Sequence, residues 1–232
     1  MVDAGEGAGV GTEQVDLAEL SRTGTWATGT TTLRRLQGHA RLLDWEKVTT
    51  RKGDSAVTEL RPTTAEEASP SSLSAVCGLG EQPLHTDGAH MPEPPDVVVL
   101  YGEEPNNTPT LLWSLSSPLT NPDHPTIRGE SSRQGGLFLV RSGIDRFLAS
   151  AHADGRYRYD PICMTPCDER AREVARYFRE VQGKAHRYEW VKPGQVLLIN
   201  NRNALHARAA VSESDVDRVL TRIAYHCPKA MQ

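Results

Sequence analysis

The sequence has no apolar run that reaches the roughly 18 residues of a membrane-spanning helix. Its N-terminal stretch, MVDAGEGAGVGTEQVD, lacks the basic and apolar regions of a secretion signal. Only four cysteines are present, Cys77, Cys163, Cys167 and Cys227, too few and too dispersed for a disulfide scaffold. We therefore expect a cytoplasmic protein with reduced thiols and no membrane partner. The CxxxC spacing of Cys163 and Cys167 favours a structural role over a metal site.

The sequence also lacks an excess of charge of either sign. It carries 26 Lys and Arg residues and 30 Asp and Glu residues, interspersed along the chain, for a net charge of -4. This balance creates no strong field that would attract nucleic acid or anionic lipid. We expect a small-molecule substrate as the partner, with homodimerisation left open.

With 232 residues, the chain is long enough for one domain with a sizeable core. Residues 1–14 are rich in Gly and Ala and bury too little apolar surface to offset the entropy of ordering, which predicts a flexible tail. Residues 15–232 are then a single domain. The stretch 116–135, rich in Pro, Ser and Asn, predicts a long insertion loop of the kind that often covers an active site.

The clearest helix is predicted at residues 168–182, where apolar side chains recur at helical spacing and Gly183 follows. A weaker helix is predicted near residues 13–21. Short apolar runs, mostly bounded by Gly, Pro, Asn or Asp, predict strands at 56–60, 97–101, 110–115, 137–140, 156–159, 188–191, 196–199 and 219–225. About eight short strands with few helices predict a mainly β fold, a jelly roll or β-sandwich with flanking α-helices.

The segment PLHTDG places His85 and Asp87 two residues apart, so that on an extended strand both side chains point the same way. A third candidate ligand, His206, follows much later, where a turn and an apolar strand lead into a polar loop. Two imidazoles and one carboxylate on one face of an octahedral ion leave three positions open, as in iron(II) oxygenases. An HxD pair alone is weak evidence, because such triplets occur by chance and a lone strand histidine is usually structural.

Two arginines beyond His206 add to this evidence. Arg218 and Arg222 lie four residues apart in the strand-like stretch RVLTR, so they share a face. A guanidinium that points inward needs an anion, because an unpaired buried charge is costly. A dicarboxylate could supply this anion through a bidentate pair. Taken alone, both residues would more simply be surface arginines.

The order HTDG, then a threonine after a short loop, then NRNALHAR and RVLTR resembles the taurine dioxygenase and clavaminate synthase-like superfamily over about residues 84–225. The resemblance implies a double-stranded β-helix, Fe(II) bound by His85, Asp87 and His206, and 2-oxoglutarate and O₂ as co-substrates. It also implies that Arg222 binds 2-oxoglutarate with help from Arg218.

The superfamily threonine that bonds the co-substrate matches Thr110, with Thr108 as an alternative register, because Asn-Asn-Thr-Pro replaces the glycines of the family loop. Asp87 retains the carboxylate that halogenating relatives lack. The implied reaction is therefore hydroxylation, desaturation or ring closure of a small polar metabolite, with release of succinate and CO₂.

Candidate substrate residues are Arg158 and Asp160, from the alternating stretch RYRYDP, and Arg202 and Arg208, which flank the metal histidine. If Arg158 and Asp160 face the metal, matched charges favour a zwitterionic substrate such as an amino acid. A solvated strand face is the simpler interpretation of the same pattern. The alternative function is a metal-dependent hydrolase or isomerase on a cupin-like barrel, which needs a positioned base and no co-substrate arginine.

Overall fold

The computed structural model describes residues 24–51, 53–70, 72–115 and 136–228. The predicted tail at 1–14, the weaker helix at 13–21 and the loop at 116–135 therefore lie outside the described residues. Among the described residues, no helix is both long and apolar enough to cross a membrane.

The largest sheet is antiparallel and runs in the order β1 (Trp26–Thr30), β12 (Gln195–Asn200), β4 (Val97–Gly102), β14 (Leu220–His226) and β2 (Glu46–Val48). Strand β3 (Val57–Leu60) also pairs with β14. The central strands β4 and β12 are buried along their whole length, which explains their near-continuous runs of Val, Leu and Ile.

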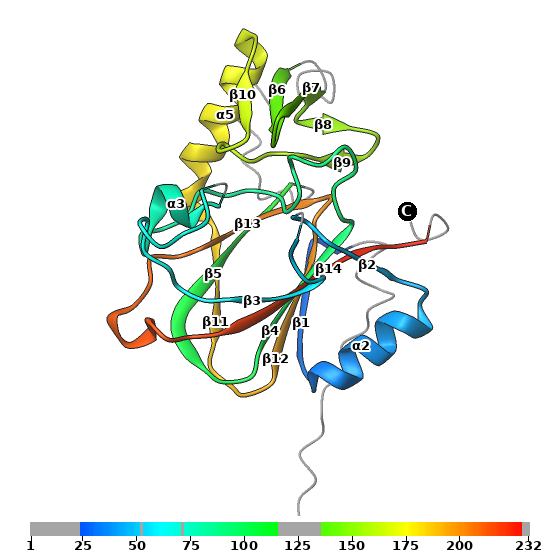
Figure 1. The fold of residues 1–232 in the computed structure, drawn as a ribbon, viewed down its shortest axis with the longest axis vertical. Helices are drawn as coiled ribbons and strands as arrows, with labels where there is room; N and C mark the ends of the chain where they lie inside the picture. Colours follow the sequence, from blue (N-terminus) through cyan, green and yellow to red (C-terminus); the bar gives the residue numbers. More distant parts are fainter. Residues whose placement is uncertain (1–23, 52, 71, 116–135, 229–232) are drawn as a thin grey trace, which may run out of the picture.

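A second antiparallel sheet has the order β11 (His186–Trp190), β5 (Asn106–Ser114) and β13 (Ala204–Arg208). An apolar layer packs between the two sheets, with side chains such as Leu100 and Leu197 from the first and Leu112 and Trp190 from the second. The two sheets therefore form a mainly β body whose inner faces meet (Figure 1).

Helix α2 (Leu33–Leu42) covers the outer face of the large sheet (Figure 1). Its buried residues Leu36 and Ala40 pack against side chains such as Val99 and Leu198. Thr32 caps the helix, since its side chain accepts a hydrogen bond from the Arg35 N–H.

A lobe formed by residues 136–184 stands at one end of the sheets (Figure 1). It contains β6 (Leu137–Ser142), β7 (Asp145–Ser150), β8 (His152–Ala153), β9 (Arg156–Tyr157), β10 (Met164–Pro166), α5 (Glu169–Val181) and a 3-10 turn (Gln182–Lys184). The Asp168 carboxylate accepts the N–H groups of Ala171 and Leu137, which starts α5 and ties it to β6. The apolar face of α5 packs on this sheet and on Leu205 and Ala207 of β13.

The two remaining short elements are α3 (Ser74–Cys77) and a 3-10 turn (Glu213–Asp215). The predicted helix at 168–182 and the mainly β class are confirmed, and all eight predicted strands are present. The strand predicted at 156–159 ends at Tyr157, and the Tyr159 N–H donates to the Thr86 side chain rather than to a neighbouring strand. Elements that were not predicted are β1, α2, β2, α3, β7, β8, β10 and β13.

Two local predictions at the candidate ligands were wrong. His206 lies on strand β13 rather than in a polar loop, because the turn at 201–203 is tight enough for β13 to begin at Ala204. His85 forms only an isolated bridge, and Asp87 begins a turn, so the pair is not part of a regular strand.

Candidate metal centre

The backbones of His85 and His206 pair with each other. The N–H of His85 donates to the carbonyl of His206 at 3.0 Å, and the N–H of His206 donates to the carbonyl of His85 at 2.9 Å. In turn, β13 pairs with β5, with His206 opposite Leu112 on the inner face. One antiparallel bridge therefore brings together two histidines that are far apart in the sequence.

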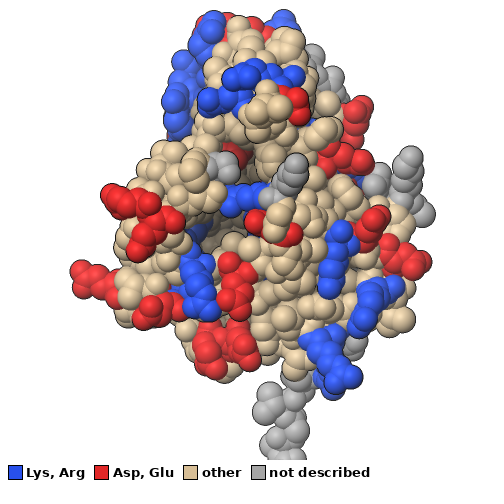
Figure 2. All heavy atoms as spheres, viewed as in Figure 1, with Lys and Arg blue, Asp and Glu red and all other residues tan. Residues whose placement is uncertain are grey.

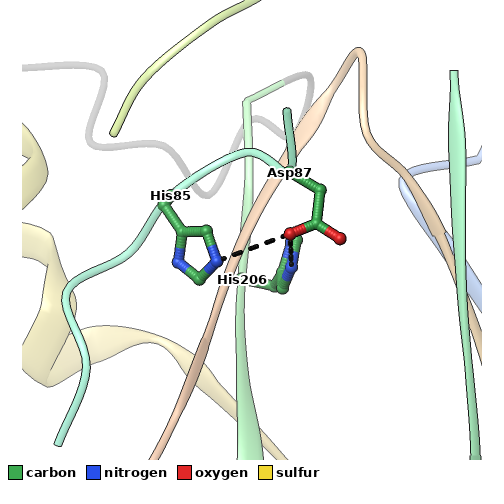
Figure 3. A group of neighbouring side chains, drawn as sticks. All are labelled: His85, Asp87 and His206. Carbon is green, nitrogen blue, oxygen red and sulfur yellow. Dashed lines mark ion pairs between the residues drawn. The ribbon is translucent and has the colours of Figure 1, made fainter. Parts of the chain in front are cut away.

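The side chains of His85, Asp87 and His206 converge, with one ligand atom from each lying within 4.8 Å of the others. Asp87 Oδ1 is 3.8 Å from Nε2 of each histidine (Figure 3). All three residues are buried. Ligand atoms of a first-row metal ion lie about 2.0–2.2 Å from it, so three atoms this close can share one ion after small side-chain movements.

The hydrogen bond that His85 makes sets its tautomer. Nδ1 of His85 lies 3.0 Å from the Pro83 carbonyl, which can only accept, so Nδ1 carries the proton and Nε2 presents a lone pair. Nδ1 of His206 is buried and has no hydrogen-bond partner among the described residues. Burial and the neighbouring His206 lower the pKa of His85, so it is neutral at pH 7 and able to bind a metal.

A guanidinium stands directly beside the carboxylate. Nη1 of Arg222 is 3.4 Å from Asp87 Oδ2, and Nη2 donates to Thr50 Oγ1 at 2.9 Å. Burial would raise the pKa of Asp87, but Arg222 and the two histidines outweigh it and hold that pKa well below its usual range. His90, which does not reach the ligand group, contacts the Thr50 carbonyl at 2.9 Å.

Arg218 and Arg208 form a second cationic region. Nη1 of Arg218 contacts Asn106 Oδ1 and the Thr108 carbonyl at 3.3 Å, and burial, then the nearby Arg208, lower its pKa to about 10. Nη2 of Arg208 donates to the carbonyls of Gly78 and Gly80. The Nε atoms of both arginines are buried without a partner in the described part of the chain.

The two candidate threonines differ in their free hydrogen-bonding capacity. Thr108 Oγ1 donates to Asp215 at 2.6 Å and accepts the Ser212 N–H, so its proton is committed. Thr110 Oγ1 accepts from Trp190 Nε1 at 3.2 Å and keeps its proton. Thr110 lies opposite Arg208 in the β5–β13 register.

The candidate substrate arginine Arg158 is bound to protein groups. Arg158 donates to the carbonyls of Ala89, Met91 and Pro92 and stacks over Phe147 at 5.3 Å. It therefore holds the loop that follows Asp87.

Arg202 Nε lies 3.6 Å from Asp96 Oδ1, away from the ligand group. Asp160 accepts the Ile162 N–H at 2.8 Å through Oδ1, and it lies close enough to His85 to oppose the lowering of that pKa. Of the four candidates, Asp160 is thus the one whose charge acts on the pKa of a candidate metal ligand.

Sequence reasoning missed two buried polar residues, Asn201 and Asp96. The Asn201 side chain binds the backbone of Asp87 on both sides, with the Asp87 N–H donating at 2.9 Å and the Asp87 carbonyl accepting at 3.0 Å. The Asp96 carboxylate accepts from Arg156 at 2.8 Å and from the Cys227 N–H at 2.9 Å. Neither lies in a ligand pattern, although Asn201 does adjoin Arg202 in NNRNALHAR.

The surface is hollowed between the lobe and the sheets, with atoms of Lys or Arg and of Asp or Glu around the hollow (Figure 2). A hollow bordered by both signs of charge suits a small polar ligand better than an extended macromolecule.

No protein-family model and no curated protein matches the chain. Solved structures do share its fold. An asparagine oxygenase in complex with Fe(II), 3-hydroxyasparagine and succinate is 17% identical with a TM-score of 0.57, and the match covers 77% of this chain and 58% of that one. The non-haem iron oxygenase OrfP, in complex with hydroxyarginine, is 18% identical with a TM-score of 0.61 over 84% of this chain and 65% of that one.

PvcB, an Fe- and α-ketoglutarate-dependent oxygenase from an isonitrile synthetic pathway, is 17% identical with a TM-score of 0.63 over 91% of this chain and 79% of its own. The chain thus spans 58% and 65% of the lengths of the first two structures. At these identities the likeness is one of fold, and the resemblance seen in the sequence motifs is confirmed at that level.

Proposed function

We propose that this protein is an Fe(II)- and 2-oxoglutarate-dependent oxygenase, built on a double-stranded β-helix, that oxidises a small amino acid or amino-acid-derived metabolite. The observation that carries the proposal is the buried grouping of His85, Asp87 and His206, with the Arg222 guanidinium 3.4 Å from the carboxylate. A fold shared with three iron oxygenases supports the same conclusion.

The donor set fits iron(II). Two imidazoles and one carboxylate on one face leave the opposite face for other ligands, whereas zinc in structural sites prefers a closed tetrahedron. When bound, Fe(II) would activate O₂ and couple its reduction to the decarboxylation of 2-oxoglutarate to succinate. The chain's own part is to hold His85 unprotonated and Asp87 ionised and to keep His206 beside them, so that all three groups can bind the ion.

We assign the two ends of 2-oxoglutarate to different arginines. Because Arg222 contacts Asp87, a carboxylate bound there would lie beside the ion. Arg218 and Arg208 lie close enough for Arg208 to lower the pKa of Arg218, so together they suit the distal carboxylate. Thr110, opposite Arg208, can donate its free hydroxyl proton to the same group. The sequence resemblance gave Arg222 the main contact with 2-oxoglutarate and Arg218 a supporting one, whereas this assignment makes Arg218 the main anchor of the distal carboxylate.

For the substrate, we propose that Asp160 binds a cationic amino group. Two of the similar structures contain hydroxylated amino acids, 3-hydroxyasparagine and hydroxyarginine. Asp160 is a carboxylate close to His85, while the donors that Arg158 uses are directed to backbone carbonyls. Arg158 and Arg202 then position the loop after Asp87 rather than bind the substrate.

The first test is anaerobic titration of the protein with Fe(II) and 2-oxoglutarate, followed through the visible charge-transfer band of the chelate. The band should form with the wild type and be lost in His206→Ala. Arg218→Met should weaken the affinity for 2-oxoglutarate by about 10- to 150-fold, since charge-assisted hydrogen bonds contribute about 1.5–3 kcal/mol. The exposed Arg187→Met is the matched control and should leave the affinity unchanged.

The second test screens free amino acids for O₂-dependent release of succinate. An amino acid should stimulate release, and Asp160→Asn should raise its KM while leaving the affinity for 2-oxoglutarate unchanged. Metal binding without any consumption of 2-oxoglutarate would instead favour a metal-dependent hydrolase or isomerase.

A further inference from the structure

Asp87 lies outside the regular sheets, yet its backbone is fully bonded. It begins the turn at 87–90, where no neighbouring strand supplies partners. The side-chain amide of Asn201 takes that place, since it accepts the Asp87 N–H at 2.9 Å and donates to the Asp87 carbonyl at 3.0 Å. The same amide donates to the Pro95 carbonyl at 2.8 Å, so it holds both ends of the loop that follows the carboxylate.

Asn201 is itself held firmly. Its exposed fraction is 1%, and its N–H donates to the Asp96 carbonyl at 2.9 Å. It stands in the short turn between β12 and β13, and β13 carries His206. One side chain therefore connects the segment that bears Asp87 to the hairpin that bears the distal histidine.

We propose that Asn201 is a positioning residue that fixes the orientation of Asp87 and keeps it in register with His206. The inference rests on the metal site of the proposed function. Partners that orient metal ligands are typically worth about 10- to 100-fold in metal affinity. Without the amide, the Asp87 N–H and the carbonyls of Asp87 and Pro95 lose their shared partner, and the turn at 87–90 loses its tie to β13.

The neighbouring Asn200 is a matched control. It is also a buried asparagine, with an exposed fraction of 4%, and its side chain makes two hydrogen bonds. Its Nδ2 donates to the Gly24 carbonyl at 3.0 Å, and its Oδ1 accepts from the Arg202 N–H at 3.2 Å. Neither bond reaches the loop after Asp87. Replacing Asn200 thus removes two partly buried amide hydrogen bonds at the end of β12, next to the same turn, without touching a candidate ligand.

The experiment compares the wild type with Asn201→Ala, Asn201→Asp and Asn200→Ala by anaerobic titration with Co(II), recording the dissociation constant, the visible d–d spectrum and Tm. Asn201→Ala should raise the Co(II) Kd by about 10- to 100-fold and alter the spectrum. Asn200→Ala should lower Tm while leaving Kd and spectrum close to wild type. Asn201→Asp keeps an acceptor for the Asp87 N–H, but its second carboxylate oxygen faces the carbonyls of Asp87 and Pro95, so its Kd should rise at least as much as that of Asn201→Ala.

Equal Kd values for Asn201→Ala and Asn200→Ala would overturn the inference, as would a wild-type Kd and spectrum in Asn201→Ala. If Asn201→Ala does not fold, the comparison of Asn201→Asp with Asn200→Ala decides in the same way. Wild-type turnover of 2-oxoglutarate reports separately on the proposed function. If the wild type binds Co(II) but consumes no 2-oxoglutarate, the proposed function is refuted, and the Co(II) titrations still decide whether Asn201 positions Asp87. If the wild type binds no Co(II), both proposals are refuted.

Discussion

Replacing Asp96 by asparagine should destabilise the protein strongly, because this carboxylate is the shared partner of two guanidinium groups and further polar groups. Its side chain is only 3% exposed, and it lies 2.8 Å from Arg156, 3.6 Å from Arg202 and 3.5 Å from His226. It also accepts the Cys227 N–H at 2.9 Å. An amide has one acceptor oxygen, so in either orientation its NH₂ group faces a donor, Arg156 or the Cys227 N–H.

The expected loss follows from burial. Removing one partner of a buried ion pair costs about 3–5 kcal/mol. Arg156 and Arg202 keep 15% and 17% of their side-chain surface exposed, so water partly compensates them, and we expect a loss at the lower end, about 3 kcal/mol. In a chain of this size that corresponds to a fall in Tm of about 6–12 °C.

Urea unfolding of Asp96→Asn should show a lower midpoint at an unchanged m-value. The control is Glu59→Gln, which breaks the 2.9 Å ion pair between Glu59 and Arg61. The side chains of Arg61 and Glu59 are 58% and 64% exposed. Exposed pairs contribute about 0–1 kcal/mol, so the control should be nearly neutral. Equal midpoints for the two variants would refute the argument from burial.

Two further predictions concern backbone conformation and pH. Gly88 and Gly143 both have a positive φ, of +68° and +62°, but a Cβ at Gly88 would lie 2.6 Å from Pro95 Cδ, whereas a Cβ at Gly143 would have no atom within 4 Å. Gly88→Ala should therefore lower the stability and the Co(II) affinity more than Gly143→Ala does. Similar losses in the two variants would show that φ alone decides. Hydrogen bonds from the N–H groups of Ala171 and Leu137 hold the pKa of Asp168 below the usual value of an aspartate. As the pH falls, the carboxylate of Asp168 therefore becomes protonated in the unfolded chain before it does in the folded one, so the free energy of unfolding should drop below about pH 4. This drop should be less steep in Asp168→Asn, and parallel acid-unfolding curves for the two proteins would contradict the prediction.

Local patterns in the sequence accounted for the elements that are uniform along their length. Helix α5 was predictable because its apolar spacing, its Asp168 cap and the following Gly183 agree with one another. Strands β4 and β12 were predictable because both faces are buried, which requires an unbroken apolar run. Strand β7 was not, since it is an edge strand with mixed exposure and its sequence, DRFLAS, shows no clean alternation.

The sequence by itself determined which residues are candidates for the metal site, because ligand chemistry depends on residue type and HxD spacing is local. Only the tertiary structure decided that His206 reaches His85, through a backbone bridge between segments that no local pattern connects. It also decided which arginine stands beside Asp87, and that one amide, Asn201, joins the two halves of the site. These facts depend on strand pairing and burial, which arise when distant segments pack together. The free energy of that packing depends on all the packed segments at once, so no single segment of the sequence reveals it.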